Sequence, residues 1–204
     1  MVNTIIFDFG DIFINKDSEA KDNALKELGL EWTEELDALE KELETGKIKE
    51  SQFLKGLQKH IPDVSIEKIK EAWNIGIGEF PLYRLEFLQK LSPNYRLFLL
   101  SNTDPIHVEK FEHDAGPSFY SDFYQCFEKV YFSYEIGTRK PDADAYNYVI
   151  NIHSIQPKRT LLVDDKKFNT DAAAQLGFKV WNLNPETEDV TEMFEKKIIL
   201  INEA

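Results

Sequence analysis

Three short apolar runs, each followed by a polar side chain, constrain the fold of this chain more than any other feature. Runs of this kind, apolar throughout, are typical of strands buried on both faces of a parallel sheet. The carboxyl ends of parallel strands lie at one edge, where open sheets bind their ligands. We therefore expect the three polar ends to meet in one site. The runs are residues 5–7 before Asp8, 97–100 before Ser101, and 161–163 before Asp164.

Helix-like and strand-like segments alternate from about residue 82 onward. Such alternation predicts an α/β fold, with a Rossmann-like parallel sheet as its core and helices on both faces. The expected strands are residues 3–9, 96–100, 129–132, 160–163 and 178–183, with 197–201 as a candidate last strand. The helices expected between them are 82–91, 106–113, 142–153 and 168–176.

Residues 17–80 differ in character, because they are rich in Glu and Lys and contain no convincing strand. Their periodicity predicts helices at 17–29, 33–45, 50–60 and 65–76, separated by turn-forming residues such as Gly46 and Pro62. This stretch therefore reads as a helical insertion after the first strand.

The net charge of −13 limits the partners of the chain, because nucleic acid and anionic membranes require a basic face. The single cysteine, Cys126, excludes an internal disulfide and fits a reducing compartment. No basic leader is visible at the N-terminus, and no apolar run approaches the ~20 residues of a membrane-spanning helix. We expect a cytoplasmic protein without a nucleic-acid or membrane partner.

Asp8, Ser101 and Lys140 have the chemistry of a phosphoryl-transfer site. A carboxylate is nucleophilic at neutral pH and can form an aspartyl-phosphate, although an isolated Asp at a strand end more often caps a turn. Ser101 and Asn102 suit either a helix cap or a phosphate-binding helix N-terminus. Lys140 is either a solvated surface charge or the cation that neutralises the phosphoryl oxygens.

Asp164 and Asp165 directly follow a run that should be buried. Adjacent carboxylates at a buried strand end repel each other unless a cation compensates their charge. A hard ion with oxygen ligands, above all Mg²⁺, is the natural partner. Asn169 and Asp171 follow at a spacing that suits support of this site from the next helix.

Taken together, these motifs resemble the haloacid dehalogenase superfamily of Mg²⁺-dependent phosphohydrolases. The match covers nearly the whole chain, and the order and spacing of four motifs make it more specific than any one of them. The chain looks most like the subgroup that includes bacterial α-glucose-1-phosphate phosphatase. The residues that carry this likeness are 100–103, 131–133, 137–141 and 163–165, with 44–48 similar to the cap pattern of that subgroup.

The resemblance implies a small helical cap at residues 16–80 on a core formed by residues 1–15 and 81–204. It makes Asp8 the nucleophile and Lys140 the electrostatic clamp, and it implies that Ser101, Asn102 and Lys140 bind the substrate phosphate. The Mg²⁺ ligands would be Asp8, the backbone carbonyl of Gly10 and Asp165, with Asp164 and Asn169 in support. One position departs from the family, because most members carry a general acid–base Asp where this chain has Gly10.

The expected function is that of a Mg²⁺-dependent phosphatase for a small phosphomonoester, with sugar phosphates as one candidate class. The first alternative is a 2-haloacid dehalogenase, against which the paired acids Asp164 and Asp165 argue. The second is a non-catalytic or regulatory protein of the same fold, which Gly10 keeps open. Metal dependence separates the first alternative from a phosphatase, and a phosphate-release screen separates the second.

Overall fold

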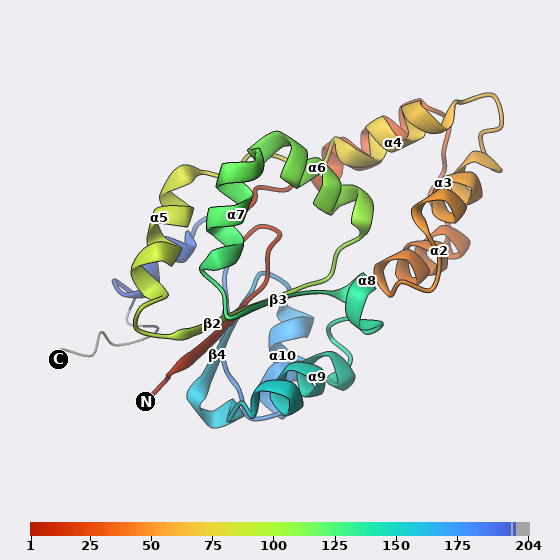
Figure 1. Ribbon diagram of the computed structural model, residues 1–204. Helices are drawn as coiled ribbons and strands as arrows, with labels where there is room; N and C mark the ends of the chain where they lie inside the picture. Colours follow the sequence, from red (N-terminus) through yellow and green to blue (C-terminus); the bar gives the residue numbers. More distant parts are fainter. Residues whose placement is uncertain (197, 199–204) are drawn as a thin grey trace.

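The computed structural model describes residues 1–196 and residue 198, and a five-stranded parallel sheet lies at its centre (Figure 1). The strand order is β3-β2-β1-β4-β5. Phe7 pairs with Leu99 on one side and with Val163 on the other, so the three central strands end at the same edge. The strands are β1 (Thr4–Phe7), β2 (Arg96–Ser101), β3 (Lys129–Phe132), β4 (Thr160–Asp164) and β5 (Lys179–Asn182).

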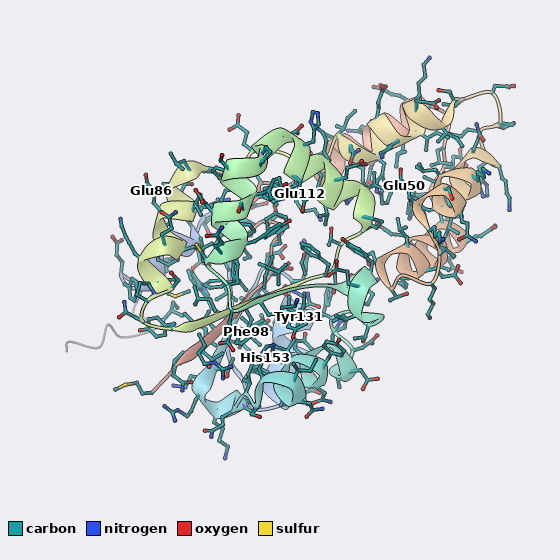
Figure 2. All side chains as sticks on the ribbon, viewed as in Figure 1. Glu50, Glu86, Phe98, Glu112, Tyr131 and His153 are labelled. Atoms are coloured by element: carbon teal, nitrogen blue, oxygen red, sulfur yellow. The ribbon has the colours of Figure 1, made fainter. Side chains whose placement is uncertain are left out.

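Helices cover both faces of the sheet, as the alternating pattern predicts (Figure 1). Successive residues of a strand point to opposite faces, so Phe7 and Leu99 pack toward one layer and Phe98 toward the other (Figure 2). The first layer holds α5 (Leu82–Leu91), α6 (Pro105–Ala115) and α7 (Pro117–Gln125). The second holds α9 (Ala143–His153) and α10 (Lys167–Gln175). The predicted fold class is confirmed.

Four helices between β1 and α5 pack around an apolar cluster of their own. Phe53 and Trp73 are fully buried there, and Ile106 of α6 joins the cluster from the core. The helices are α1 (Ser18–Glu27), α2 (Glu34–Glu44), α3 (Glu50–Gln58) and α4 (Ile66–Asn74). They make up the region that we call the cap, while its limits at residues 16 and 80 stay a prediction.

The two chain segments that join cap and core run antiparallel and are hydrogen-bonded to each other. The backbone N–H of Asp17 donates to the carbonyl of Gly76 at 2.9 Å, and that of Gly78 donates to the carbonyl of Asn15 at 2.9 Å. A Cβ on Gly78 would lie only 2.7 Å from the Asn15 carbonyl oxygen, so the close approach requires glycine there. This paired connection holds the cap at the carboxyl edge of the sheet.

Some elements differ from those predicted. The helix α7 is not among the predicted helices. Its nine residues are rich in Phe, Tyr and Ser, which are weak helix formers, and burial of Phe123 in the core stabilises it instead. The short helix α8 (Ser133–Ile136) and the 3₁₀ turns η1 (Pro157–Arg159) and η2 (Val190–Met193) are also absent from the prediction. The strand expected at 197–201 falls, apart from Ile198, outside the described residues. None of the described helices is long and apolar enough to cross a membrane.

Candidate active site

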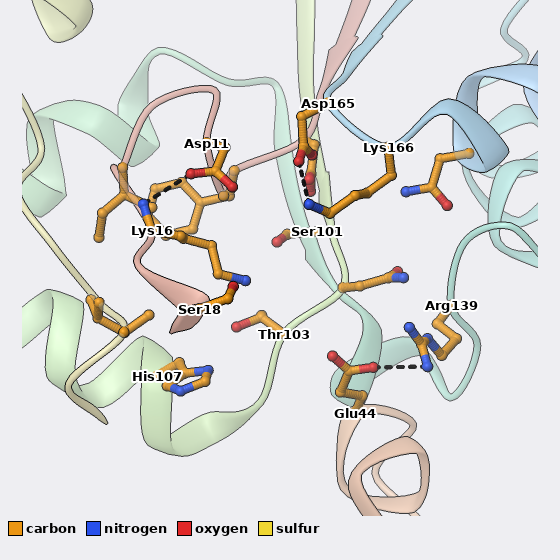
Figure 3. A pocket seen from close by; sticks show the side chains of 18 of the residues that line it. Asp11, Lys16, Ser18, Glu44, Ser101, Thr103, His107, Arg139, Asp165 and Lys166 are labelled. Carbon is orange, nitrogen blue, oxygen red and sulfur yellow. Dashed lines mark hydrogen bonds and ion pairs between the residues drawn. The ribbon is translucent and has the colours of Figure 1, made fainter. Parts of the chain in front are cut away.

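A pocket of about 170 Å³ lies between the carboxyl edge of the sheet and the cap (Figure 3). Asp8, Ser101 and Asp165 line it from the strand ends of the core, and Glu44 lines it from the cap. The structure thus brings the side chains at the carboxyl ends of β1, β2 and β4 together, as the strand pattern predicts. Their roles in catalysis and binding stay predictions.

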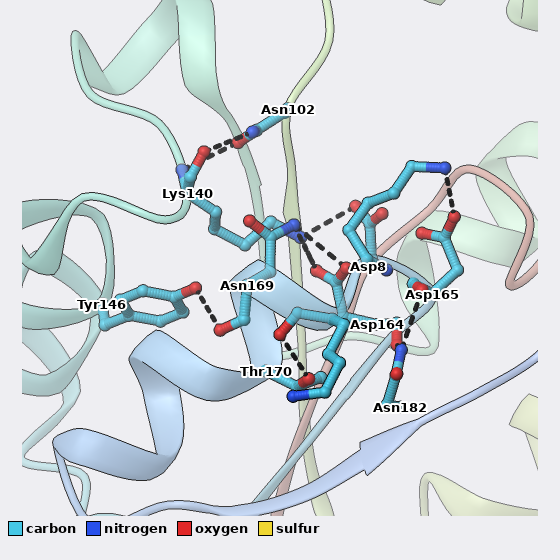
Figure 4. Close-up of polar contacts among 11 residues, drawn as sticks. Asp8, Asn102, Lys140, Tyr146, Asp164, Asp165, Asn169, Thr170 and Asn182 are labelled. Carbon is cyan, nitrogen blue, oxygen red and sulfur yellow. Dashed lines mark hydrogen bonds and ion pairs between the residues drawn. The ribbon is translucent and has the colours of Figure 1, made fainter.

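Lys140 lies at the centre of the charged network beneath this pocket (Figure 4). Its side chain is 0% exposed, and its Nζ lies 2.5 Å from Asp164 Oδ2 and 3.0 Å from Asp8 Oδ1. A solvated surface charge is therefore excluded for Lys140. Burial alone would lower the pKa of Lys140, but the carboxylates of Asp164 and Asp8 outweigh it and hold the pKa above its usual value. The residue is a fixed cation beside the candidate nucleophile.

Asp8 is itself nearly buried. Burial raises its pKa to about 6, with Lys140 opposing the shift and the charges of Asp164 and Asp165 adding to it. The ionised form is still the main one at neutral pH, so the carboxylate retains its nucleophilic form. A further nearby cation would favour this charged form.

Asn102 holds the backbone of Lys140 with both ends of its side-chain amide. Its Nδ2 donates to the Lys140 carbonyl at 2.7 Å, and its Oδ1 accepts from the Lys140 N–H at 2.9 Å. The Asn102 amide thus positions Lys140, and phosphate binding by Asn102 stays a prediction. Ser101 is the last residue of β2 and lines the pocket, so it remains the candidate hydroxyl for phosphate binding.

Asp164 and Asp165 point in different directions and make different contacts. Asp164 is fully buried and accepts hydrogen bonds from the Lys166 N–H at 2.9 Å and from Asn169 Nδ2 at 3.0 Å. Asp165 faces the pocket, where its Oδ2 lies 2.6 Å from Lys166 Nζ. Lys140 and Lys166 therefore already offset part of the repulsion between these two carboxylates, in addition to any bound metal.

The site nevertheless fits a divalent cation. One carboxylate oxygen from each of Asp8, Asp164 and Asp165 lies within 4.8 Å of the others, and hard cations prefer such oxygen ligands. Asp164 is saturated with donors, so it suits a supporting role, while Asp8 and Asp165 suit direct ligation. Asn169 supports Asp164, as expected, and the Gly10 carbonyl stays a predicted ligand.

Asp171 lies outside the site, contrary to the expectation that it supports the metal. Its carboxylate is exposed on α10 and lies 2.6 Å from Lys167 Nζ, one helical turn away. The spacing from Asp165 is compatible with either face of a helix start, so the sequence does not distinguish the two outcomes.

The side chain of Lys16 fills the space beside Gly10, where the resemblance implies a general acid in most family members. A Cβ added to Gly10 would lie 2.6 Å from Lys16 Cδ, so the lysine stem fills that space. The next residue, Asp11, adopts a left-handed backbone with φ of 59° and accepts from the Lys16 N–H at 2.9 Å. Burial raises the pKa of Asp11, which also lines the pocket.

Glu44 and Arg139 form an ion pair between cap and core, and neither is among the site residues predicted from the sequence. Glu44 Oε2 lies 3.1 Å from Arg139 Nη1, and both side chains line the pocket. Burial raises the pKa of Glu44 to about 7, against the opposing charge of Arg139. Each residue lies in one of the motifs described above, residues 44–48 and 137–141, which is the only indication of a role in the sequence. Their spacing along the chain does not indicate that the two side chains meet.

The comparison with protein-family models decides the family. Residues 2–177 match the model described as haloacid dehalogenase-like hydrolase. The chain belongs to this family. It is 30% identical over 191 residues to D-ribitol-5-phosphate phosphatase of Bacteroides thetaiotaomicron. The aligned region covers 89% of this chain and 91% of the relative.

Two solved structures are similar over most of the chain. The HAD family enzyme bt-2542 of Bacteroides thetaiotaomicron, solved with magnesium and inorganic phosphate, has a TM-score of 0.85 at 31% identity and covers 95% of this chain and 100% of its own. A predicted HAD-like family hydrolase of Porphyromonas gingivalis has a TM-score of 0.78 at 29% identity, covering 89% and 90%. These matches confirm the predicted family and fold. They also bear out the predictions of a phosphoric monoester hydrolase and of Mg²⁺ as cofactor.

Proposed function

We propose that this protein is a Mg²⁺-dependent phosphatase that hydrolyses a small phosphomonoester through an aspartyl-phosphate on Asp8. The observation that carries the proposal is the position of Asp8, which lies at the end of β1, in the pocket and 3.0 Å from a fully buried lysine. A buried carboxylate beside a fixed cation is suited to attack a dianionic phosphoryl group, because the lysine lowers the repulsion between the two.

In the first step a carboxylate oxygen of Asp8 attacks phosphorus, and the bond from phosphorus to the ester oxygen breaks. The substrate alcohol departs and takes up a proton, and water then hydrolyses the acyl phosphate to regenerate Asp8 and release inorganic phosphate. Lys140 stabilises the negative charge throughout because it is held by Asn102 and Asp164. A Mg²⁺ ion bound by Asp8 and Asp165 would add positive charge next to the phosphoryl oxygens.

The substrate class that we propose is a sugar or polyol phosphate. The relative from Bacteroides thetaiotaomicron is by name a D-ribitol-5-phosphate phosphatase, and it is similar to this chain over nearly its whole length. The pocket supports the same class, because charged side chains line its cap side, including Lys16, Lys21, Glu40 and Glu44. Such a lining suits a leaving group with many hydroxyls.

A phosphate-release assay with Mg²⁺ tests the proposal. We expect the wild-type protein to release phosphate from ribitol 5-phosphate and 4-nitrophenyl phosphate. Asp8→Asn should lower kcat by at least about 10³-fold, because an amide cannot act as the nucleophile. Asp171→Asn is the matched control, since it makes the same change at an exposed carboxylate of α10 outside the pocket.

The outcome also separates the two alternatives. Activity of Asp8→Asn within tenfold of wild type would contradict the assignment of the nucleophile. Release of halide from 2-haloacids without Mg²⁺ would support a dehalogenase, and an absence of turnover on all substrates would support a regulatory protein of the same fold.

A further inference from the structure

Glu44 and Arg139 face each other at the pocket (Figure 3), and each has one buried polar atom without a hydrogen-bond partner among the described residues. Among the described residues, neither Glu44 Oε2 nor Arg139 Nε makes a hydrogen bond, although both atoms are buried. The 3.1 Å contact between Glu44 Oε2 and Arg139 Nη1 is an ion pair by distance, but its geometry is not that of a hydrogen bond. Buried polar atoms are nearly always satisfied, so we expect these two to bind either an ordered water or a polar group of a ligand that displaces it.

A hydroxyl group is complementary to both atoms at once. It carries one donor and two acceptor positions, so it can donate to the Glu44 carboxylate while it accepts from Arg139 Nε–H. A second phosphate or carboxylate would be repelled by Glu44, an ammonium group would be repelled by Arg139, and a methylene would leave both atoms unsatisfied. The chemistry of the pair thus favours a neutral hydroxyl.

The pair lies in the same pocket as the candidate nucleophile and joins its two walls. Glu44 is the last residue of α2 in the cap, whereas Arg139 directly precedes Lys140 in the core. A substrate whose phosphate lies against Asp8 therefore extends its leaving group toward a wall that both parts of the protein build. Lys21 and Glu40, 3.7 Å apart, continue this charged lining along the cap.

We propose that Glu44 and Arg139 are specificity-determining residues, which bind hydroxyl groups of the leaving-group portion of a polyhydroxylated phosphomonoester. The inference rests on the proposed phosphatase activity and adds to it the residues that select the substrate. It predicts that the enzyme distinguishes a polyol phosphate from an alkyl phosphate of the same length.

Ribitol 5-phosphate and n-pentyl phosphate test this selection, because both release a five-carbon primary alcohol. We expect wild-type kcat/KM to be about 100-fold or more higher for ribitol 5-phosphate, since a site built to bind hydroxyls disfavours an analogue that lacks them. The double variant Glu44→Met/Arg139→Met keeps the net charge and much of the packing. It should lose about 30-fold or more with ribitol 5-phosphate and less than about threefold with n-pentyl phosphate.

Two further variants keep the test decisive. If the double variant does not fold, Glu44→Gln serves in its place, and we expect about a tenfold loss with ribitol 5-phosphate alone. The control is Glu109→Gln, which removes the Lys70–Glu109 ion pair between cap and core, 2.6 Å long and away from the active-site pocket. It should leave the ratio between the two substrates unchanged.

The opposite results are equally clear. Equal wild-type kcat/KM for both substrates, or an equal loss of both in the pair variants, would overturn the inference and mark the pair as a structural tether. Failure of the wild type to release phosphate even from 4-nitrophenyl phosphate would instead refute the proposed phosphatase activity, and this inference with it.

Discussion

At the scale of single residues, the buried lysine is the most demanding feature of the site. Lys140 is fully buried between Asp8 and Asp164, so its removal leaves two buried carboxylates without their cation. Breaking a buried ion pair in this way typically costs about 3–5 kcal/mol. We expect Lys140→Met to reduce the free energy of unfolding by about that amount and to lower kcat more than it raises KM.

A double-mutant cycle with Asp164→Asn separates the two effects. Because the second change removes one of the stranded charges, Lys140→Met/Asp164→Asn should be less destabilised than the sum of the single variants, as measured by urea unfolding. Activity should not return, since the cation is still missing. Strictly additive losses of stability would show that the two side chains are not coupled.

The glycine at position 10 leads to a second prediction for single residues, which concerns how kcat/KM depends on the leaving group. A positioned general acid is worth roughly 10²–10⁴ in rate, and Gly10 cannot supply one. The missing proton matters least for alcohols that are already acidic, so kcat/KM should rise steeply as the pKa of the leaving group falls. We expect aryl and anomeric phosphates to be hydrolysed faster than primary alkyl phosphates.

A variant with a carboxylate at position 10 tests this interpretation, and the structure shows which neighbouring side chain must be shortened to accommodate it. Because a Cβ at position 10 would lie 2.6 Å from Lys16 Cδ, Gly10→Asp should be combined with Lys16→Ala to make room for the carboxylate. A shallower dependence on leaving-group pKa in Gly10→Asp/Lys16→Ala than in Lys16→Ala alone would support the interpretation. A flat profile in the wild type would show that another residue already donates the proton, and Asp11 is then the first to substitute.

At the scale of elements, the end of α2 packs closely against α8 of the core. Gly46 has φ of +66°, and a Cβ there would lie 2.2 Å from the backbone oxygen of Tyr134 in α8. Gly46→Ala should therefore push the cap away from the core. We expect a loss of stability of about 1–3 kcal/mol, by thermal unfolding, and a lower kcat/KM, because Glu44 moves with the cap.

Gly29 provides a matched control for this element. It has φ of +92°, but the nearest atom to an added Cβ is a side-chain carbon of Ile61 at 3.8 Å. Gly29→Ala thus introduces comparable backbone strain within the cap without a clash at its border. Equal losses of activity in the two variants would contradict the role of the α2 contact.

The elements also show how far the sequence determines the structure. The strand ends at Asp8, Ser101 and Asp164 were predictable because a parallel sheet brings the ends of buried apolar runs to one edge. The helix α7 was not predictable from periodicity, because tertiary burial of Phe123 overrides weak local propensity. The contact between the Asn102 amide and the Lys140 backbone was not predictable either, because the two residues lie 38 positions apart in the chain.

At the scale of the whole molecule, the site is shared between two packed units, and this explains what the sequence could not provide. Asp8 and Lys140 lie on the core, where their family motifs identify them. Glu44 and Arg139 meet because the cap packs over the sheet edge, to which the paired segments around Asn15 and Gly78 connect it. A contact across such a border depends on docking and not on any local pattern.

Two buried carboxyl groups, those of Asp8 and Glu44, make the stability of the whole molecule depend on pH, and Mg²⁺ should modify this dependence. Burial raises the pKa of Asp8 from 3.8 to about 6 and that of Glu44 from 4.5 to about 7. At a pH between the unfolded and the folded pKa of each group, the folded state binds more protons than the unfolded state. These two groups therefore lower the free energy of unfolding as pH rises to about 7. Their contribution is constant above that value.

A bound cation should reverse the part due to Asp8, because it favours the charged carboxylate and binds only the folded state. We therefore expect Mg²⁺ to raise the Tm more at pH 7.5 than at pH 4.5, against EDTA as reference. Asp165→Ala should lose most of this response. Glu44→Gln should keep the Mg²⁺ response. In EDTA its Tm should fall less between pH 4.5 and pH 7.5 than that of the wild type, because the carboxyl group of Glu44 with its raised pKa is gone. A Mg²⁺ response of equal size at both pH values, or one that survives in Asp165→Ala, would show that the cation binds elsewhere.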